Sequence, residues 1–168
     1  MDLVLVQNDP ARTDFITSDG IPLYTSRTQE LLQGKAKCTT VRRFERESSL
    51  AAQTLELALG CYSTGDVVVE TERKNSWKFT GPDFKPYKWQ IFIQYPVLIL
   101  DDNSQLPLAR YKRAKLGIVS RPRRPSLEIF SAGINSLDLI VVTFVSFMIY
   151  RFAGTDNSSS TSSESSPG

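Results

Sequence analysis

The chain has 168 residues, of which 40% are hydrophobic and 23% charged, and its formal net charge is +2. This length suits one domain with a sizeable core, and the small net charge excludes a protein whose whole surface attracts polyanions. The absence of histidine removes the usual general base and the usual zinc ligand, and no glycine-rich phosphate loop is present. We therefore expect a protein that is not an enzyme, with no catalytic residues, no metal site and no cofactor.

The two cysteines and the first residues bear on the cellular compartment. Cys38 and Cys61 show no CxxC spacing and fit two reduced thiols in an intracellular protein. The segment from Met1 to Val6 has no basic residue and only four consecutive apolar residues, unlike a secretory signal peptide. These features predict a cytoplasmic protein.

From the first residues to Phe130, short segments alternate apolar and polar residues or are rich in β-branched residues, which is typical of half-buried strands. We expect strands at 55–61, 67–69, 87–94, 97–100 and 127–129. Leu116–Val119 indicates one more short strand. The segment Ser48–Leu59 is ambiguous, because its composition favours a helix while its second half alternates. We interpret it as a strand.

A repeated pattern supports a succession of hairpins. Three times, a turn signal rich in Asp, Asn or Gly leads into a proline and then into an aromatic residue. The copies are Asp19-Gly20 with Pro22 and Tyr24, Gly81-Pro82-Asp83 with Pro86 and Trp89, and Asp101-Asp102-Asn103 with Pro107 and Tyr111. In each copy we expect the aromatic side chain to pack on the strand that returns from the turn.

Leu139–Tyr150 is the most hydrophobic run of the chain. As a helix it would be roughly 18 Å long, against ~30 Å for the hydrocarbon core of a bilayer, so we expect a buried helix and no transmembrane segment. Asn135 is a candidate N-cap, and Asp138 three residues later suits the helix dipole, which predicts a helix from about Leu137 to Phe152. A strand is the alternative, since Val, Ile and Phe dominate the run.

The serine- and threonine-rich segment after Gly154 has nothing to bury. We therefore expect one domain over residues 1–154 and a disordered tail over residues 155–168.

Five segments carry a resemblance to a known fold. They are Asp19-Gly20-x-Pro22-Leu23-Tyr24, Phe79-Thr80-Gly81-Pro82-Asp83, Tyr87-Lys88-Trp89, Ser126-Leu127-Glu128-Ile129-Phe130 and Asp138-Leu139-Ile140-Val141-Val142-Thr143-Phe144-Val145. Over about residues 1–150 the chain is similar to an uncharacterised domain family common in mushroom-forming fungi, and it resembles the tubby-like barrel. The resemblance implies a mostly β fold, an antiparallel tubby-like β-barrel closed around a central hydrophobic C-terminal helix.

Tubby-like proteins include phospholipid scramblases, plant LURP-one proteins and tubby itself, which binds phosphoinositides. The resemblance brings no family-wide catalytic residues to this chain, and the chain departs from the family pattern after Phe147.

The strongest functional signal is the stretch from Arg110 to Arg124, which contains seven basic residues and no acidic one. Pro122 and Pro125 place its second basic cluster in a loop. A basic edge of this kind attracts anionic lipid headgroups by about 1 kcal/mol per residue near the membrane surface. The predicted lipid-binding residues are Lys112, Arg113, Lys115, Arg121, Arg123 and Arg124.

The sequence thus predicts a non-enzymatic binding module for anionic membrane lipid such as phosphoinositide. The alternatives are a protein-interaction scaffold of unknown partner and a solvated basic face with no partner. Nucleic acid is disfavoured, because Tyr111 is the only aromatic residue among these charges and stacking on bases needs several.

Overall fold

The computed structural model describes residues 1–30, 37–44, 56–59, 76–117 and 121–153. These residues form ten strands in one antiparallel sheet, a short 3-10 helix and one α-helix. The strands are β1 (Asp2–Leu5), β2 (Thr13–Ile16), β3 (Pro22–Glu30), β4 (Lys37–Arg43), β5 (Glu56–Leu59), β6 (Ser76–Thr80), β7 (Pro86–Phe92), β8 (Tyr95–Leu100), β9 (Pro107–Lys112) and β10 (Ser126–Ile129). The helices are η1 (Ser131–Ser136) and α1 (Leu137–Ala153).

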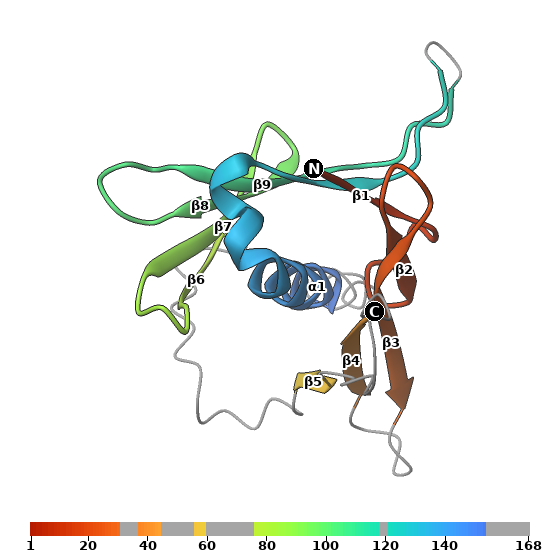
Figure 1. Cartoon of the computed structure of the whole chain (residues 1–168), viewed down its shortest axis with the longest axis horizontal. Helices are drawn as coiled ribbons and strands as arrows, with labels where there is room; N and C mark the ends of the chain where they lie inside the picture. Colours follow the sequence, from red (N-terminus) through yellow and green to blue (C-terminus); the bar gives the residue numbers. More distant parts are fainter. Residues whose placement is uncertain (31–36, 45–55, 60–75, 118–120, 154–168) are drawn as a thin grey trace, which may run out of the picture.

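The sheet order is β5-β4-β3-β2-β1-β10-β9-β8-β7-β6, and every neighbouring pair is antiparallel. Figure 1 shows the sheet curving around α1, which lies on its concave side. Within the described residues β5 and β6 are the two edge strands and do not pair, so the sheet is open between them. The mostly β architecture with a C-terminal helix is confirmed, while closure into a barrel is not seen in this part of the chain.

The three copies of the turn–proline–aromatic pattern each begin a strand. The prolines are the first residues of β3, β7 and β9, where a residue without an N–H costs no ladder hydrogen bond. The aromatic residues that follow are almost fully buried. They are Tyr24, Trp89 and Tyr111. The repeat therefore marks hairpins, as expected, and supplies much of the aromatic core.

Two expected strands differ from the structure. The predicted strand 87–94 ends at Phe92, because Ile93 and Gln94 form a tight turn with positive φ angles of 45° and 73°. Leu116 and Gly117 belong to no strand, since Leu116 is 91% exposed and the φ of Gly117 is 82°. Predictions for 48–55, 60–61, 67–69, 118–119 and 154–168 lie outside the described residues.

The C-terminal helix is confirmed, but it begins differently. Asn135 lies inside η1, which runs directly into α1, so Asn135 is not an N-cap. Asp138 instead accepts hydrogen bonds from the Tyr24 hydroxyl and from Arg43 Nη1, which lies 2.9 Å from its Oδ2. Burial, and next the hydrogen bond to Asp138, raise the pKa of Tyr24, so the phenol remains a donor. These contacts tie the start of α1 to β3 and β4.

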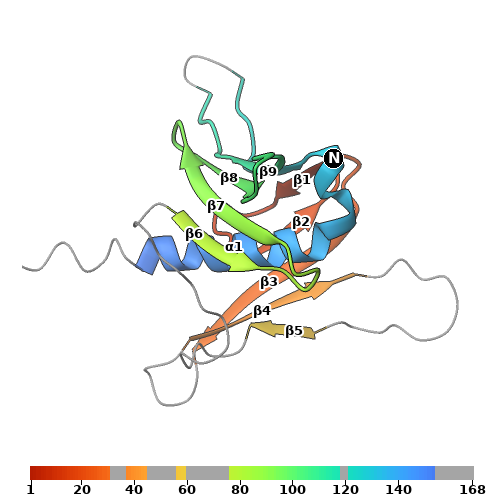
Figure 2. The same ribbon diagram turned by 90° about the vertical axis from the view of Figure 1, so that its left-hand side faces the viewer.

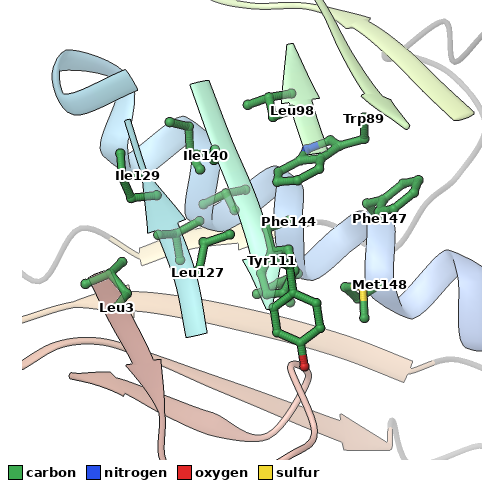
Figure 3. Close-up of a cluster of buried hydrophobic side chains, with 14 of the residues drawn as sticks. Leu3, Trp89, Leu98, Tyr111, Leu127, Ile129, Ile140, Phe144, Phe147 and Met148 are labelled. Carbon is green, nitrogen blue, oxygen red and sulfur yellow. The ribbon is translucent and has the colours of Figure 1, made fainter. Parts of the chain in front are cut away.

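The core lies between the concave side of the sheet and α1, whose residues 140–148 are all buried. The ring of Phe144 lies 5.0 Å from Tyr111 and 5.8 Å from Trp89, measured between centroids (Figure 3). Trp89 also stacks on Phe147 at 5.7 Å. Each such pair contributes roughly 0.5–1.5 kcal/mol beyond its area burial. Because Phe15 on β2 also lies 6.3 Å from Phe144, aromatic packing on α1 holds both halves of the sheet around the helix.

By length and composition, the continuous helical stretch Ser131–Arg151, with mean hydropathy 1.8, could cross a bilayer. This differs from the expectation based on Leu139–Tyr150 alone, because η1 and α1 follow each other without a break. In the structure, 56% of the 18-residue segment that meets the hydropathy criterion is buried inside the domain. The stretch therefore has the position of a core helix, a kind of helix that passes the same length test.

Candidate lipid-binding site

The described residues 113–117 and 121–124, between β9 and β10, form a projection that we call the basic arm. Figures 1 and 2 show the described parts, 113–117 and 121–124, extending away from the body of the sheet. The Lys115 N–H donates to the Arg123 carbonyl at 2.9 Å, and the Arg123 N–H donates to the Lys115 carbonyl at 3.1 Å. A Cβ on Gly117 would lie 3.0 Å from a Pro122 carbon, so glycine allows the two sides to approach.

The basic arm carries five exposed basic side chains and no acidic residue. They are Arg113, Lys115, Arg121, Arg123 and Arg124. None of the five forms an ion pair with another residue that the structure describes. Five of the six predicted lipid-binding residues therefore lie together on one projection with their charges open to solvent.

Lys112, the sixth predicted residue, differs from the others because Glu128 meets its charge. Lys112 is half-buried in β9, and its Nζ lies 3.1 Å from Glu128 Oε1 on β10. Arg110 donates to the other carboxylate oxygen from Nη2 at 2.6 Å and from Nε at 3.0 Å. Burial alone would raise the pKa of Glu128, but the hydrogen bonds from Lys112 and Arg110 lower it. Lys112 thus belongs to the base of the basic arm rather than to its free charge.

Arg151, in the last turn of α1, is a basic residue that the predicted lipid-binding set did not include. Its Nη1 is buried and has no hydrogen-bond partner among the described residues. Burial, and then the positive charge of Arg113, lower the pKa of Arg151. Sequence patterns did not predict this electrostatic interaction, because Arg113 and Arg151 are far apart in the chain.

Exposed apolar side chains lie on and near the basic arm, and the sequence analysis did not predict them. Leu116 on the arm is 91% exposed. The register pairs Val97 with Arg110, which places the start of β8 beside the end of β9. The turn between β7 and β8, with Phe92 at 61% and Ile93 at 75% exposure, therefore lies at the end of the sheet from which the arm leaves. We call this end the arm end.

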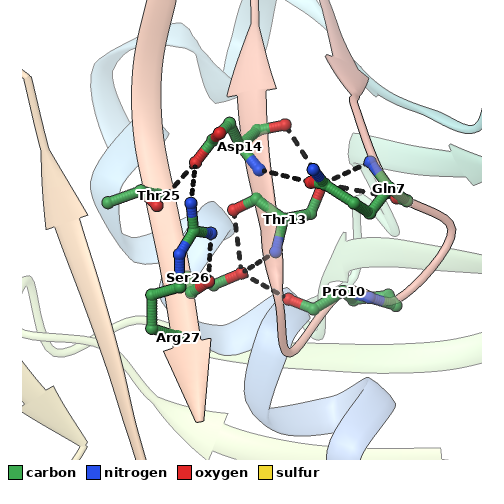
Figure 4. Close-up of polar contacts among 7 residues, drawn as sticks. All are labelled: Gln7, Pro10, Thr13, Asp14, Thr25, Ser26 and Arg27. Carbon is green, nitrogen blue, oxygen red and sulfur yellow. Dashed lines mark hydrogen bonds and ion pairs between the residues drawn. The ribbon is translucent and has the colours of Figure 1, made fainter.

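A polar cluster between β2 and β3, shown in Figure 4, is a structural feature of the same region. Thr13 and Ser26 are fully buried, and the Ser26 hydroxyl donates to the Pro10 carbonyl at 2.7 Å. The Thr13 N–H donates to Ser26 Oγ at 3.1 Å, and the Gln7 N–H donates to Thr13 Oγ1 at 2.9 Å. Because these groups satisfy one another, the cluster holds the loop between β1 and β2 and offers no free ligand.

In the described part of the chain, no three side chains of the Cys, Asp, Glu or His type are grouped to hold a metal ion. Fold and site together define a class: a curved antiparallel sheet packed on one hydrophobic C-terminal helix, with a basic projection between β9 and β10. The chain belongs to a family of unknown function, DUF6593, whose family model matches residues 8–151. That match contains β2 to β10, the basic arm and nearly all of α1. No curated protein and no solved structure matches the chain.

Proposed function

We propose that this chain is a non-enzymatic binding module that attaches to anionic membrane lipid, such as phosphoinositide, through the basic arm. The observation that carries the proposal is the set of five exposed basic side chains on one projection, without an acidic residue among them. At about 1 kcal/mol per basic residue near an anionic surface, such a set is sufficient for reversible attachment. The exposed Leu116 supports the same reading, because an apolar group can enter the headgroup region beside the charges.

The proposal extends to the type of fold and to its location. The curved sheet around one apolar helix supports a tubby-like barrel, closed between β5 and β6, as the resemblance to a fungal domain family implies. This fold type is distantly like that of phospholipid scramblases and LURP-one proteins. A cytoplasmic location fits a module that meets anionic lipid, since the cytoplasmic leaflet carries most of it.

The test is co-sedimentation with phosphoinositide-containing liposomes. Replacing Arg121, Arg123 and Arg124 together with glutamine should weaken binding about 100-fold at about 0.1 M salt, where the Debye length is ~10 Å. At about 1 M salt wild type should lose binding too. The melting temperature should be nearly unchanged, because exposed charges contribute little to folding.

Two control variants test whether the loss of binding depends on the charge and on the position of these residues. Replacing the same three residues with lysine keeps the charge and should retain most binding, whereas Lys85→Gln, at the opposite end of the sheet, should change nothing. A glutamine triple variant that binds liposomes as well as wild type would show that the basic arm is only a solvated face. Association that survives about 1 M salt and needs no lipid would favour the alternative, a protein-interaction scaffold.

A further inference from the structure

The turn between β7 and β8 has a sequence that its backbone disfavours. Ile93 and Gln94 both adopt positive φ angles, 45° and 73°, in a two-residue hairpin turn that ordinarily takes Asn-Gly or Gly-Gly. A β-branched residue in this conformation is a genuine outlier. Burial does not compensate for it, because the side chain of Ile93 is 75% exposed and that of the preceding Phe92 is 61% exposed. Folding alone therefore does not account for two large apolar residues at this tip.

The position of the turn suggests what these residues contact. Figure 2 shows the β7–β8 turn and the basic arm both rising at the top of the molecule, in agreement with the pairing of Val97 with Arg110. The arm end therefore presents exposed apolar residues on two separate projections, Leu116 on the arm and Ile93 on the turn. Basic residues surround the first of them. A flat anionic surface with an apolar interior matches this combination of charge and apolar tips.

The charged residues at the opposite end of the sheet indicate how the domain would be oriented at a membrane. The described turns between β2 and β3, β6 and β7, and β8 and β9 lie there. Their acidic residues are Asp19, Asp83, Asp101 and Asp102, of which Asp83 pairs with Lys85 and Asp101 with Lys78. The pKa of Asp83 is lowered by the hydrogen bond from Tyr87, so this acid is ionised at neutral pH. An anionic membrane therefore attracts the arm end, with its five exposed basic side chains, more strongly than the opposite end.

We propose that the domain docks end-on, with the β7–β8 turn as a second membrane contact beside the basic arm. In this arrangement Phe92, Ile93 and Leu116 enter the boundary between headgroups and acyl chains, while the acidic end faces water. The inference rests on the proposed lipid-binding function and deepens it, because it names the apolar anchor and the orientation. It predicts that apolar insertion, as well as charge, contributes to attachment.

The experiment compares two substitutions with the same backbone effect at opposite ends of the sheet. Ile93→Asn and Phe84→Asn each place asparagine at a positive φ angle, 45° and 59°, and each removes an exposed apolar side chain. Asparagine tolerates this conformation, so both variants should melt at or a few degrees above the wild-type temperature. Ile93→Asn should nevertheless weaken binding to phosphatidylcholine–phosphatidylserine vesicles about tenfold, while Phe84→Asn should bind like wild type.

The outcomes separate this inference from the proposed function. Loss of binding by the Arg121, Arg123 and Arg124 glutamine variant, together with wild-type binding by Ile93→Asn, would overturn end-on docking and leave the arm as the lipid site. Equal weakening by Phe84→Asn would also overturn it, because both ends would then contact the vesicle. Wild-type binding by the glutamine variant would instead refute the lipid-binding function itself. A stabilised but weakly binding Ile93→Asn protein supports end-on docking, since a structural role would lower stability and binding together.

Discussion

Thr143 makes a polar link between the buried middle of α1 and the sheet. Its hydroxyl oxygen accepts the Trp89 indole N–H at 3.0 Å and lies 2.7 Å from the Leu139 carbonyl oxygen, to which the hydroxyl donates. Trp89 is fully buried, so the indole has no access to water as an alternative partner. One hydroxyl thus satisfies the largest side chain of the core and keeps Trp89 in place against α1.

We expect Thr143→Val to destabilise the domain by about 1–3 kcal/mol, because the buried indole N–H of Trp89 would lose its acceptor. The matched control is Ser146→Ala. Within the part of the chain that the structure describes, the Ser146 hydroxyl donates to the Val142 carbonyl of its own helix, at 2.9 Å, and not to the sheet. This control should cost less than about 1 kcal/mol. Urea denaturation of both variants measures the difference, and equal losses would mean that the link between Trp89 and Thr143 contributes nothing specific.

At the scale of elements, α1 is unusual in being buried on nearly all sides. Residues 140–148 are buried, and strands from both halves of the sheet contribute contacts, including Phe15 on β2 and Tyr111 on β9. A helix that is apolar all round either fills a core or spans a membrane. Its place on the concave side of the sheet is that of a core helix.

Val145→Asp should therefore unfold the whole domain, because Val145 is fully buried and an unpaired carboxylate would be stranded in the core. Tyr150→Asp, on the same helix at a position that is 53% exposed, should leave the domain folded. Circular dichroism and tryptophan fluorescence check both variants. A Val145→Asp protein that stays folded but no longer associates with membranes would instead indicate that α1 is a membrane anchor.

At the scale of the whole molecule, the ten strands form one continuous sheet with β5 and β6 at its two edges. Each strand pairs with its neighbours in the chain, except that β1 pairs with β10 and β5 does not meet β6 within the described residues. The proposed closure requires hydrogen bonds along the edge of β6 that faces away from β7.

Amide hydrogen exchange tests this closure. If the sheet closes, the β6 amides that face away from β7 should exchange as slowly as amides of β7, which is bonded on both sides. The exposed turn amides of Ile93 and Gln94 provide the fast reference. Fast exchange along the outer edge of β6 would show an open sheet and would remove the support for a tubby-like barrel.

Local periodicity was sufficient to predict several elements of this protein. The alternation in β7 and β10 and the prolines that open β3, β7 and β9 reflect contacts within a few residues, and so does the apolar run of α1. The sequence also located the basic stretch. It did not reveal the turn at Ile93 and Gln94, because alternation continued through a pair that lacks any usual turn residue. Asp138 lies in the first turn of α1 as expected, but its partners Tyr24 and Arg43 were not predicted, because they are far away in the chain.

Residue types and local patterns were enough to predict a mostly β domain with a buried C-terminal helix and a dense group of basic residues. Which of those basic residues are free depends on the packing of distant segments. The register of β9 with β10 sets Arg110 opposite Glu128 and brings Lys112 to the same carboxylate, whereas Arg121 and Arg123 lie on a projection beyond the sheet. Charge is a property of residue types, but its neutralisation depends on strand register and on the direction in which a hairpin leaves the sheet. Those are set by packing between segments that are distant in the chain.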